Sequence, residues 1–433
     1  MRLNLMKKGG LPISFAVLIA SGTLLLLLPG VCRHELSPID AFFTACSAVC
    51  LNGLAAVPTD EFTFFGQLII LLLLQLGCFG ILSLSAMILL LAGRGLSIDN
   101  TLIMYNLNDR FSLGRTESLL RTIAHYTFIA EAVGAVLMFP GFLFDGFGFW
   151  KSLWYALFFS VGSFCNAGIA PLRDSLMSVN VFIQSVSMAL IVLGGIGVYV
   201  IYDLLQMVRD RRHRMRLHSR IVLGSSALLI VGGALALWII GMAPSGGSPG
   251  IFDALYMSVA SRTAGYSTID IAMLSPACLT LIIVLMLIGG SPGSTAGGIK
   301  TSTAAVAMAA LITSFKGDSE VIICSRTIAL RTVLRAFTII VLFVVLTVLG
   351  ALLLNTFSPG LDGLQCFFEI ASAISGTGLD AGEVTGGLDP GCKALVAFFM
   401  YIGRVGPLTV IMFLVGKEKS IPLHYPEERV IVG

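Results

Sequence analysis

The chain has 433 residues, of which 56% are hydrophobic and only 12% charged, with a formal net charge of +3 and a mean hydropathy of +0.94. A soluble protein of this length could not cover so much apolar surface, so the composition predicts a polytopic membrane protein. The nine cysteines lie mostly in or beside apolar runs and show no Cys-x-x-Cys spacing, which indicates packing residues and not a disulfide framework.

Eight apolar stretches are near or above the ~20 residues needed to cross a hydrocarbon core. They cover residues 12–30, 67–93, 124–142, 178–206, 221–241, 277–314 with an interruption, 334–356 and 394–415. Basic residues precede the first stretch, as in a signal peptide, but no small-residue cleavage site follows it, so we interpret it as the first span. Eight spans place both termini on the same side of the membrane.

Basic residues concentrate in the connections on one side of these spans, with six arginines between residues 209 and 220. The opposite side holds only Arg33, Lys151, Arg173, Arg262 and Lys393. Because positively charged loops remain cytoplasmic, both termini are predicted to lie in the cytoplasm of a cell-membrane protein. The basic clusters are short connectors, which argues against a nucleic-acid interface.

Four shorter segments lie between consecutive spans, at 38–50, 152–165, 252–262 and 362–375. A helix about 18 Å long cannot cross a hydrocarbon core of about 30 Å. We therefore expect each segment to be a re-entrant pore helix that is buried in protein or lines water, because lipid offers no partner for its backbone. Residues suited to cap these helices are Ser37, Ser152, Asp253 and Asp362, with Pro38 at a first helical position.

Each short segment leads into a glycine that precedes a bulky apolar residue. These glycines are Gly53, Gly168, Gly265 and Gly378, at intervals of 115, 97 and 113 residues. The period predicts four parallel repeats, covering 1–95, 96–210, 211–318 and 319–433, each with a span, a pore helix and a span. A single such glycine often serves only a tight turn, whereas four in register favour strands whose carbonyls face one central axis. The predicted fold class is an all-α polytopic membrane protein around a pseudo-fourfold pore.

These four repeats resemble the Trk/Ktr/HKT superfamily of potassium transporters, as do the Ser-Arg-Thr-Ala-Gly stretch at 261–265 and the Gly-Gly-Ser-Pro-Gly-Ser-Thr-Ala-Gly-Gly-Ile-Lys-Thr stretch at 289–301. The first pore segment follows the first span directly, which is more similar to the Ktr-type membrane subunit than to the longer Trk type. The resemblance implies potassium uptake through a filter of backbone carbonyls. Glycine at all four positions implies potassium over sodium, while sodium stays open as a coupled or activating ion.

The resemblance also assigns residues to this filter. The implied potassium-binding positions are Cys50, Leu51, Asn52 and Gly53; Cys165, Asn166, Ala167 and Gly168; Arg262, Thr263, Ala264 and Gly265; and Ser375, Gly376, Thr377 and Gly378. Asn52 stands where the family often has threonine, and Gly376 adds a second glycine to the last strand. We expect both departures to loosen the filter.

A glycine-rich break in the sixth span predicts an irregular loop below the filter. The resemblance makes this loop a gate, with Gly290, Gly293, Gly297, Gly298 and Lys300 in the loop and Arg404 in the last span. Arg404 is either part of a barrier to cations or a cap on loop carbonyls. Glycines 293 and 298 have P-loop spacing, but Ile299 displaces Lys300 from the position that a P-loop requires. Glu131, inside the third span, has no partner that the sequence identifies.

The chain has no sizeable soluble region, so we expect no nucleotide on it. The resemblance implies a homodimer above a cytoplasmic nucleotide-binding ring of the regulator-of-conductance type, which would contact the arginine-rich connectors. The alternatives are a Trk-type or less selective potassium/sodium transporter and a secondary transporter of an organic solute. The solute transporter would show inverted repeats, whereas these run parallel. A membrane enzyme is a further alternative, but the five histidines lack metal-ligand spacing.

Overall fold

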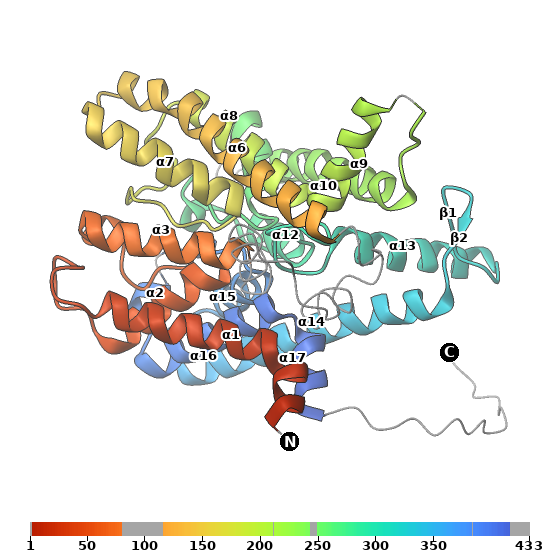
Figure 1. The fold of residues 1–433 in the computed structure, drawn as a ribbon. Helices are drawn as coiled ribbons and strands as arrows, with labels where there is room; N and C mark the ends of the chain where they lie inside the picture. The colour runs from red at the N-terminus through yellow and green to blue at the C-terminus, as the bar shows by residue number, and fades with distance from the viewer. Residues whose placement is uncertain (1, 80–115, 211, 243–248, 383, 416–433) are drawn as a thin grey trace.

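The computed structural model describes residues 2–79, 116–210, 212–242, 249–382 and 384–415. It is mostly helical (Figure 1). The helices outside the four predicted short segments are α1 (Arg2–Leu26), α3 (Phe64–Phe79), α6 (Thr116–Phe144), α8 (Val181–Ile196), α9 (Val198–Arg209), α10 (Leu217–Gly241), α12 (Pro276–Leu287), α13 (Thr301–Lys316), α14 (Leu330–Phe357), α16 (Pro390–Val405) and α17 (Pro407–Val415). The four predicted short segments correspond to α2 (Pro38–Cys50), α7 (Phe149–Cys165), α11 (Ile251–Ala260) and α15 (Gly363–Ser375), of which α7 and α11 begin earlier than predicted. A hairpin of β1 (Ile322–Ile323) and β2 (Arg326–Thr327) was not expected.

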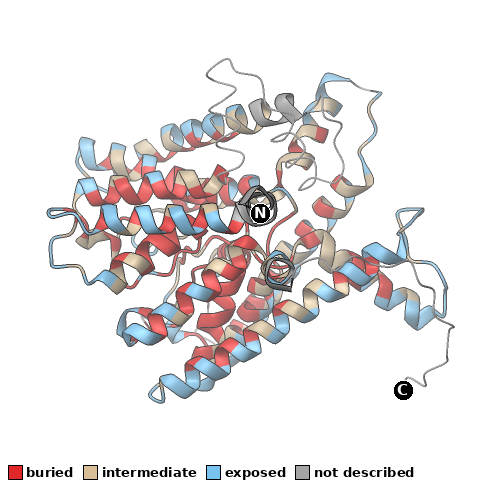
Figure 2. Cartoon of the chain, turned by 60° about the horizontal axis from the view of Figure 1, so that its bottom comes forward, coloured by how far each residue is buried: buried red, intermediate tan, exposed pale blue. Residues whose placement is uncertain are grey.

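The helices are arranged so that each quarter of the chain contacts the next. The helix that follows one short helix packs on the following short helix: α3 on α7, α8 on α11 and α12 on α15. The circuit closes because α16 packs on α2, which brings the first and last quarters of the chain side by side (Figure 1). Buried residues gather in the centre of the molecule, around the short helices, whereas exposed residues follow the outer helices (Figure 2).

Three uninterrupted helices in the described residues are long and apolar enough to cross a membrane. They are Thr122–Phe144 within α6, and all of α10 and α14, and their outer faces carry exposed apolar side chains such as Val136 and Leu228. Not all of the eight predicted spans are therefore seen as continuous helices. Residues 80–93 of the second span, the repeat boundary at 95–96 and the tail at 416–433 lie outside the described residues.

Two predicted spans are broken. The stretch at 178–206 divides into α8 and α9, which are bent by 96° at Gly197, where φ is +88°. The stretch at 394–415 divides into α16 and α17 at Gly406, where φ is +91°. A left-handed glycine ends each first helix, and Pro407 then begins α17 at a position where its missing N–H costs nothing. The predicted interruption of the sixth span lies between α12 and α13, over residues 288–300.

Two of the four predicted helix caps are wrong. Ser37 caps α2 by accepting a hydrogen bond from the Asp40 N–H at 3.2 Å, and Asp362 caps α15 in a capping box with Gln365. However, α7 and α11 begin directly after Gly148 and Gly250. Ser152 and Asp253 therefore lie inside these helices, because glycine adopts the extended cap conformation without any side-chain hydrogen bond.

Helices approach closely where the sequence placed small residues. A Cβ atom on Gly77 of α3 would overlap the Val49 carbonyl of α2, and one on Gly194 of α8 would overlap the Phe164 carbonyl of α7. Gly403 of α16 meets the Ile374 carbonyl of α15 in the same way. In three quarters of the chain, a glycine thus brings the following helix against the last turn of α2, α7 or α15.

Replacing Gly77 by alanine tests this packing. We expect Gly77→Ala to destabilise the protein by about 1–3 kcal/mol, because the new methyl group must displace backbone. The control is Gly224→Ala in α10, where a Cβ atom would meet nothing within 4 Å. Apparent melting temperatures of the detergent-solubilised proteins should fall for Gly77→Ala and stay equal or rise for Gly224→Ala. Equal melting temperatures for the two variants would contradict the packing.

Candidate functional site

The glycines that follow the four short helices lie against one another in cyclic order and form what we call the four-glycine ring: Gly53, Gly168, Gly265 and Gly378. Their φ angles are +112°, +60°, +68° and +83°, all in the region that favours glycine. A Cβ atom on each would crowd or overlap a carbonyl oxygen of the next strand, belonging in the same order to Ala167, Ala264, Thr377 and Asn52. The ring therefore closes through backbone contacts that leave no room for side chains.

These four carbonyl groups are buried and unpaired. The residues that carry them are completely buried, with 0% of their surface exposed: Asn52, Ala167, Ala264 and Thr377. Within the described part of the chain, no hydrogen bond ends on any of these four carbonyl oxygens. Buried carbonyl groups nearly always have a hydrogen-bond or ion partner, so these four oxygens are candidate ligands for a cation.

The strands reach the ring because the short helices end abruptly. Leu51, Asn166 and Gly376 follow α2, α7 and α15 in the left-handed conformation, so the chain reverses within one residue. The next N–H groups then return to the last helical turn, as when Ala167 donates to the Gly162 carbonyl at 3.0 Å. The C-terminal ends of all three helices thus lie beside the ring, with their partial negative charge.

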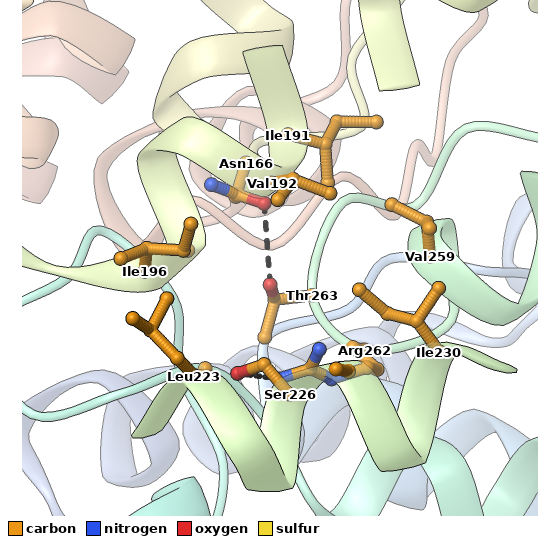
Figure 3. Close-up of a pocket in the computed structure, with 13 residues that line it drawn as sticks. Asn166, Ile191, Val192, Ile196, Leu223, Ser226, Ile230, Val259, Arg262 and Thr263 are labelled. Atoms are coloured by element: carbon orange, nitrogen blue, oxygen red, sulfur yellow. Dashed lines mark hydrogen bonds between the residues drawn. The ribbon is translucent and has the colours of Figure 1, made fainter. Parts of the chain in front are cut away.

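Side chains connect neighbouring strands around the ring. Asn52 donates through Nδ2 to the Ala373 and Ser372 carbonyls at 2.8 and 3.2 Å. Thr263 donates to Asn166 Oδ1 at 3.3 Å, as Figure 3 shows. Asn52 therefore joins the ring to α15 by two hydrogen bonds.

Thr377 and Glu369 brace the last strand. Thr377 Oγ1 donates to the Ser261 carbonyl at 3.3 Å, which joins the third and fourth quarters of the chain. The Glu369 side chain is completely buried and accepts from the Ala381 N–H and from Thr385 Oγ1, both at 2.9 Å. The sequence analysis did not assign Glu369 to the site, although a carboxylate among the apolar residues of 362–375 is a signal that could have found it.

Arg262 is buried inside the protein and does not lie in an exposed outer loop, as its charge had suggested. It was grouped with the cations of the outer loops, but only 8% of its surface is exposed. Its Nη2 donates to the Gly289 carbonyl at 3.2 Å and to Ser226 Oγ of α10 at 3.4 Å. Its backbone belongs to the strand before Gly265, while its side chain extends behind the strand and towards the 288–300 loop.

The 288–300 loop lies directly against one end of the ring. Gly297 packs on the Ser375 carbonyl so closely that a Cβ atom would overlap it. The ends of the loop meet in a bridge between Ile288 and Ile299. The Ser291 N–H donates to the Gly195 carbonyl at 3.0 Å, which fixes the loop to the break between α8 and α9.

Two cations hold this loop through its carbonyls. Arg404 donates from Nη1 to the Thr295 carbonyl at 2.6 Å and from Nη2 to the Gly77 carbonyl at 2.7 Å. Lys300 donates through Nζ to the Ala296 carbonyl at 2.5 Å. Among the described residues, neither cation forms an ion pair with a carboxylate. The loop, α3 and α16 are therefore joined by hydrogen bonds from Arg404.

Glu131, for which the sequence identified no partner, binds a glutamine of α3. The Gln75 Nε2 atom donates to its two carboxylate oxygens at 3.1 and 3.2 Å. The thiol of Cys165, the last residue of α7, lies 3.8 Å from Glu131 Oε1. A glutamine inside an apolar helix was the available signal, because such a side chain needs a polar partner.

Comparisons with known proteins identify the family of this chain. A family model described as "TrkH: Cation transport protein" matches residues 10–421. The potassium/sodium uptake protein NtpJ of Enterococcus hirae is 34% identical over 97% of this chain and 95% of its own length. The Ktr system potassium uptake protein B of Vibrio alginolyticus is 34% identical over 98% of this chain and 96% of its own.

The fold agrees with a solved transporter. The crystal structure of the potassium transporter TrkH from Vibrio parahaemolyticus matches with a TM-score of 0.74, and the match covers 93% of this chain and 83% of that one. At 19% identity this likeness shows a shared fold. The family model and the relatives above 30% identity show more: the chain belongs to the Trk/Ktr family of cation transport proteins.

Proposed function

We propose that this protein takes up potassium across the cell membrane through a pore on the axis of the four-glycine ring. The observation that carries the proposal is the set of buried, unpaired carbonyl oxygens at Asn52, Ala167, Ala264 and Thr377. Such a ring replaces part of the hydration shell of a potassium ion. The names of the relatives, which describe potassium or potassium/sodium uptake, support this choice of ion.

The surrounding helices favour a cation at the same place. The C-terminal ends of α2, α7 and α15 lie beside the ring, and each contributes the equivalent of about half a negative charge there. Binding to backbone oxygens needs no particular side chain, so the four different strands can still form one site. In this proposal the chain comprises the four predicted repeats, has both termini in the cytoplasm and carries out no chemical step.

The 288–300 loop is the proposed gate. Gly297 sits on the Ser375 carbonyl at one end of the ring, where it obstructs the axis. The guanidinium group of Arg404 adds positive charge at the same depth and repels cations. Opening then requires the loop to leave the Thr295–Arg404–Gly77 contacts, because these hold it beneath the ring.

A cytoplasmic regulator is the proposed partner, acting on a homodimer of this chain. The arginine-rich connector after α9 is linked to that helix by Asp203, which binds His213 Nε2 at 2.7 Å and accepts from Ser219 Oγ at 2.6 Å. At its other end, α9 contacts the gate, because the Val198 N–H donates to the Gly293 carbonyl at 3.1 Å. A force on the connector can thus reach the 288–300 loop through one helix.

Ion uptake by a glycine variant tests the proposed filter. In a potassium-uptake-deficient bacterium, the wild-type chain with its regulator should restore growth at low potassium and take up rubidium. Gly53→Ser should lower the preference for potassium over sodium about tenfold, equivalent to ~1.4 kcal/mol, because its Cβ would lie 2.8 Å from the Ala167 carbonyl oxygen. Repeating the uptake measurement with and without sodium shows whether rubidium uptake depends on sodium.

Gly30→Ser is the matched control for that variant. Gly30 has φ of +84°, so serine there is also strained, but a Cβ atom meets nothing within 4 Å. Its selectivity should equal that of the wild type. If Gly53→Ser and Gly30→Ser transport with the same selectivity, the ring is not the filter; if the wild type fails to take up rubidium, the potassium assignment itself is wrong.

Removing Arg404 tests the gate. Charge-assisted hydrogen bonds contribute about 1.5–3 kcal/mol each, so Arg404→Ala should free the loop and raise rubidium flux several-fold in liposomes without the regulator. Arg404→Lys, which keeps the charge but loses the paired geometry, should give an intermediate flux. Protein amount and monodispersity must match the wild type. A well-folded Arg404→Ala protein with unchanged or lower flux would show that Arg404 only caps carbonyls.

A further inference from the structure

A cavity of about 190 Å³ lies beside the ring, between α8, α10 and α11. The buried residues Arg262, Thr263 and Asn166 form what we call its inner end. Figure 3 shows Thr263 between the other two, with apolar side chains on both sides. The apolar walls include Ile191 of α8 and Ile230 of α10. The cavity exceeds the ~150 Å³ of an engineered apolar cavity that binds benzene.

The inner end of this cavity holds a buried cation without a counter-charge. Arg262 is 92% buried, and its Nε atom has no hydrogen-bond partner. Its two hydrogen bonds both come from Nη2, and no described carboxylate lies within 4 Å of it. A buried charge is normally paired, so this guanidinium group lacks an acceptor on its Nε side.

The outer end of the cavity opens on an apolar surface. Ala227 of α10 is exposed at the rim, and Leu223 one turn earlier is partly exposed. Beside them, Leu228 is 73% exposed on the face of a helix that is long enough to cross the membrane. A molecule entering here therefore comes from the bilayer and not from water.

We infer that this cavity binds a fatty acid, an amphiphile with one carboxylate and an unbranched apolar tail. The carboxylate would accept hydrogen bonds from the Arg262 guanidinium group, whose planar donors match two carboxylate oxygens. The tail would lie between Ile191 and Ile230 and leave past Ala227 into the lipid. A cavity of about 190 Å³ leaves room for one acyl chain and not for the two of a phospholipid, which favours the free acid.

Photolabelling tests the site without measuring transport, so its outcome is separate from that of the proposed function. The full-length protein in liposomes is exposed to lauric acid that carries a diazirine in its tail, and labelled peptides are identified by mass spectrometry. Label is expected on α8 and α10 at the cavity walls. Ala227→Trp, which fills the rim, should reduce this labelling about tenfold, equivalent to ~1.4 kcal/mol.

Leu228→Trp is the matched control, because it adds the same side chain one residue further along α10, outside the cavity. It should label as the wild type does. Unlabelled lauric acid should compete about tenfold better than dodecanol, since a charge-assisted hydrogen bond is about twice as strong as a neutral one. Arg262→Gln should abolish that difference between the two competitors.

Three results would overturn the inference. The first is label spread evenly over the lipid-facing helices, and the second is equal labelling of Ala227→Trp and Leu228→Trp. The third is equal competition by lauric acid and dodecanol against the wild type, which would mean that the cavity takes apolar tails and that water satisfies Arg262.

Discussion

At the centre of this protein, four glycines bring backbone against backbone, so no side chain separates the strands that precede them. Because of this contact, the carbonyl groups of each strand face the neighbouring strand. The strands begin where α2, α7, α11 and α15 end. Closure also requires the first and last quarters of the chain to meet, which α2 and α16 accomplish. The neighbouring helices pack closely around the ring, because glycines in α3, α8 and α16 bring these helices against α2, α7 and α15.

Below the ring, the protein uses charged groups to hold irregular backbone. The 288–300 loop has carbonyl groups that a regular helix would have satisfied internally, and Arg404 and Lys300 donate to them instead. The same loop contacts the break at Gly197, from which α9 leads to the Asp203 cluster and the basic connector. Arg404 of α16 and the bend at Gly197 thus both contact the 288–300 loop. This makes the loop a suitable point of control.

Positions that require a particular residue type could be predicted from the sequence. Positions that depend on contacts with distant parts of the chain could not. The glycine register was readable because left-handed backbone leaves a glycine signature in each quarter. Caps at Ser152 and Asp253 were predicted wrongly because glycine can cap a helix without a side chain. The small residues at 193–197 allowed a bend, but its angle of 96° was not predicted, because hydropathy records apolar content and not helix direction. The burial of Arg262 and the pairing of Glu131 depend on elements distant in sequence, which no local pattern reports.

The most direct test of the central claim is to locate bound ions in an experimental structure. Crystals of the protein grown in rubidium or thallium salts would give anomalous density at each bound ion. The account predicts peaks on the axis of the four-glycine ring, between the carbonyl oxygens of Asn52, Ala167, Ala264 and Thr377. Ordered ions elsewhere in the membrane region, with none at the ring and water or protein donors on those oxygens, would contradict it.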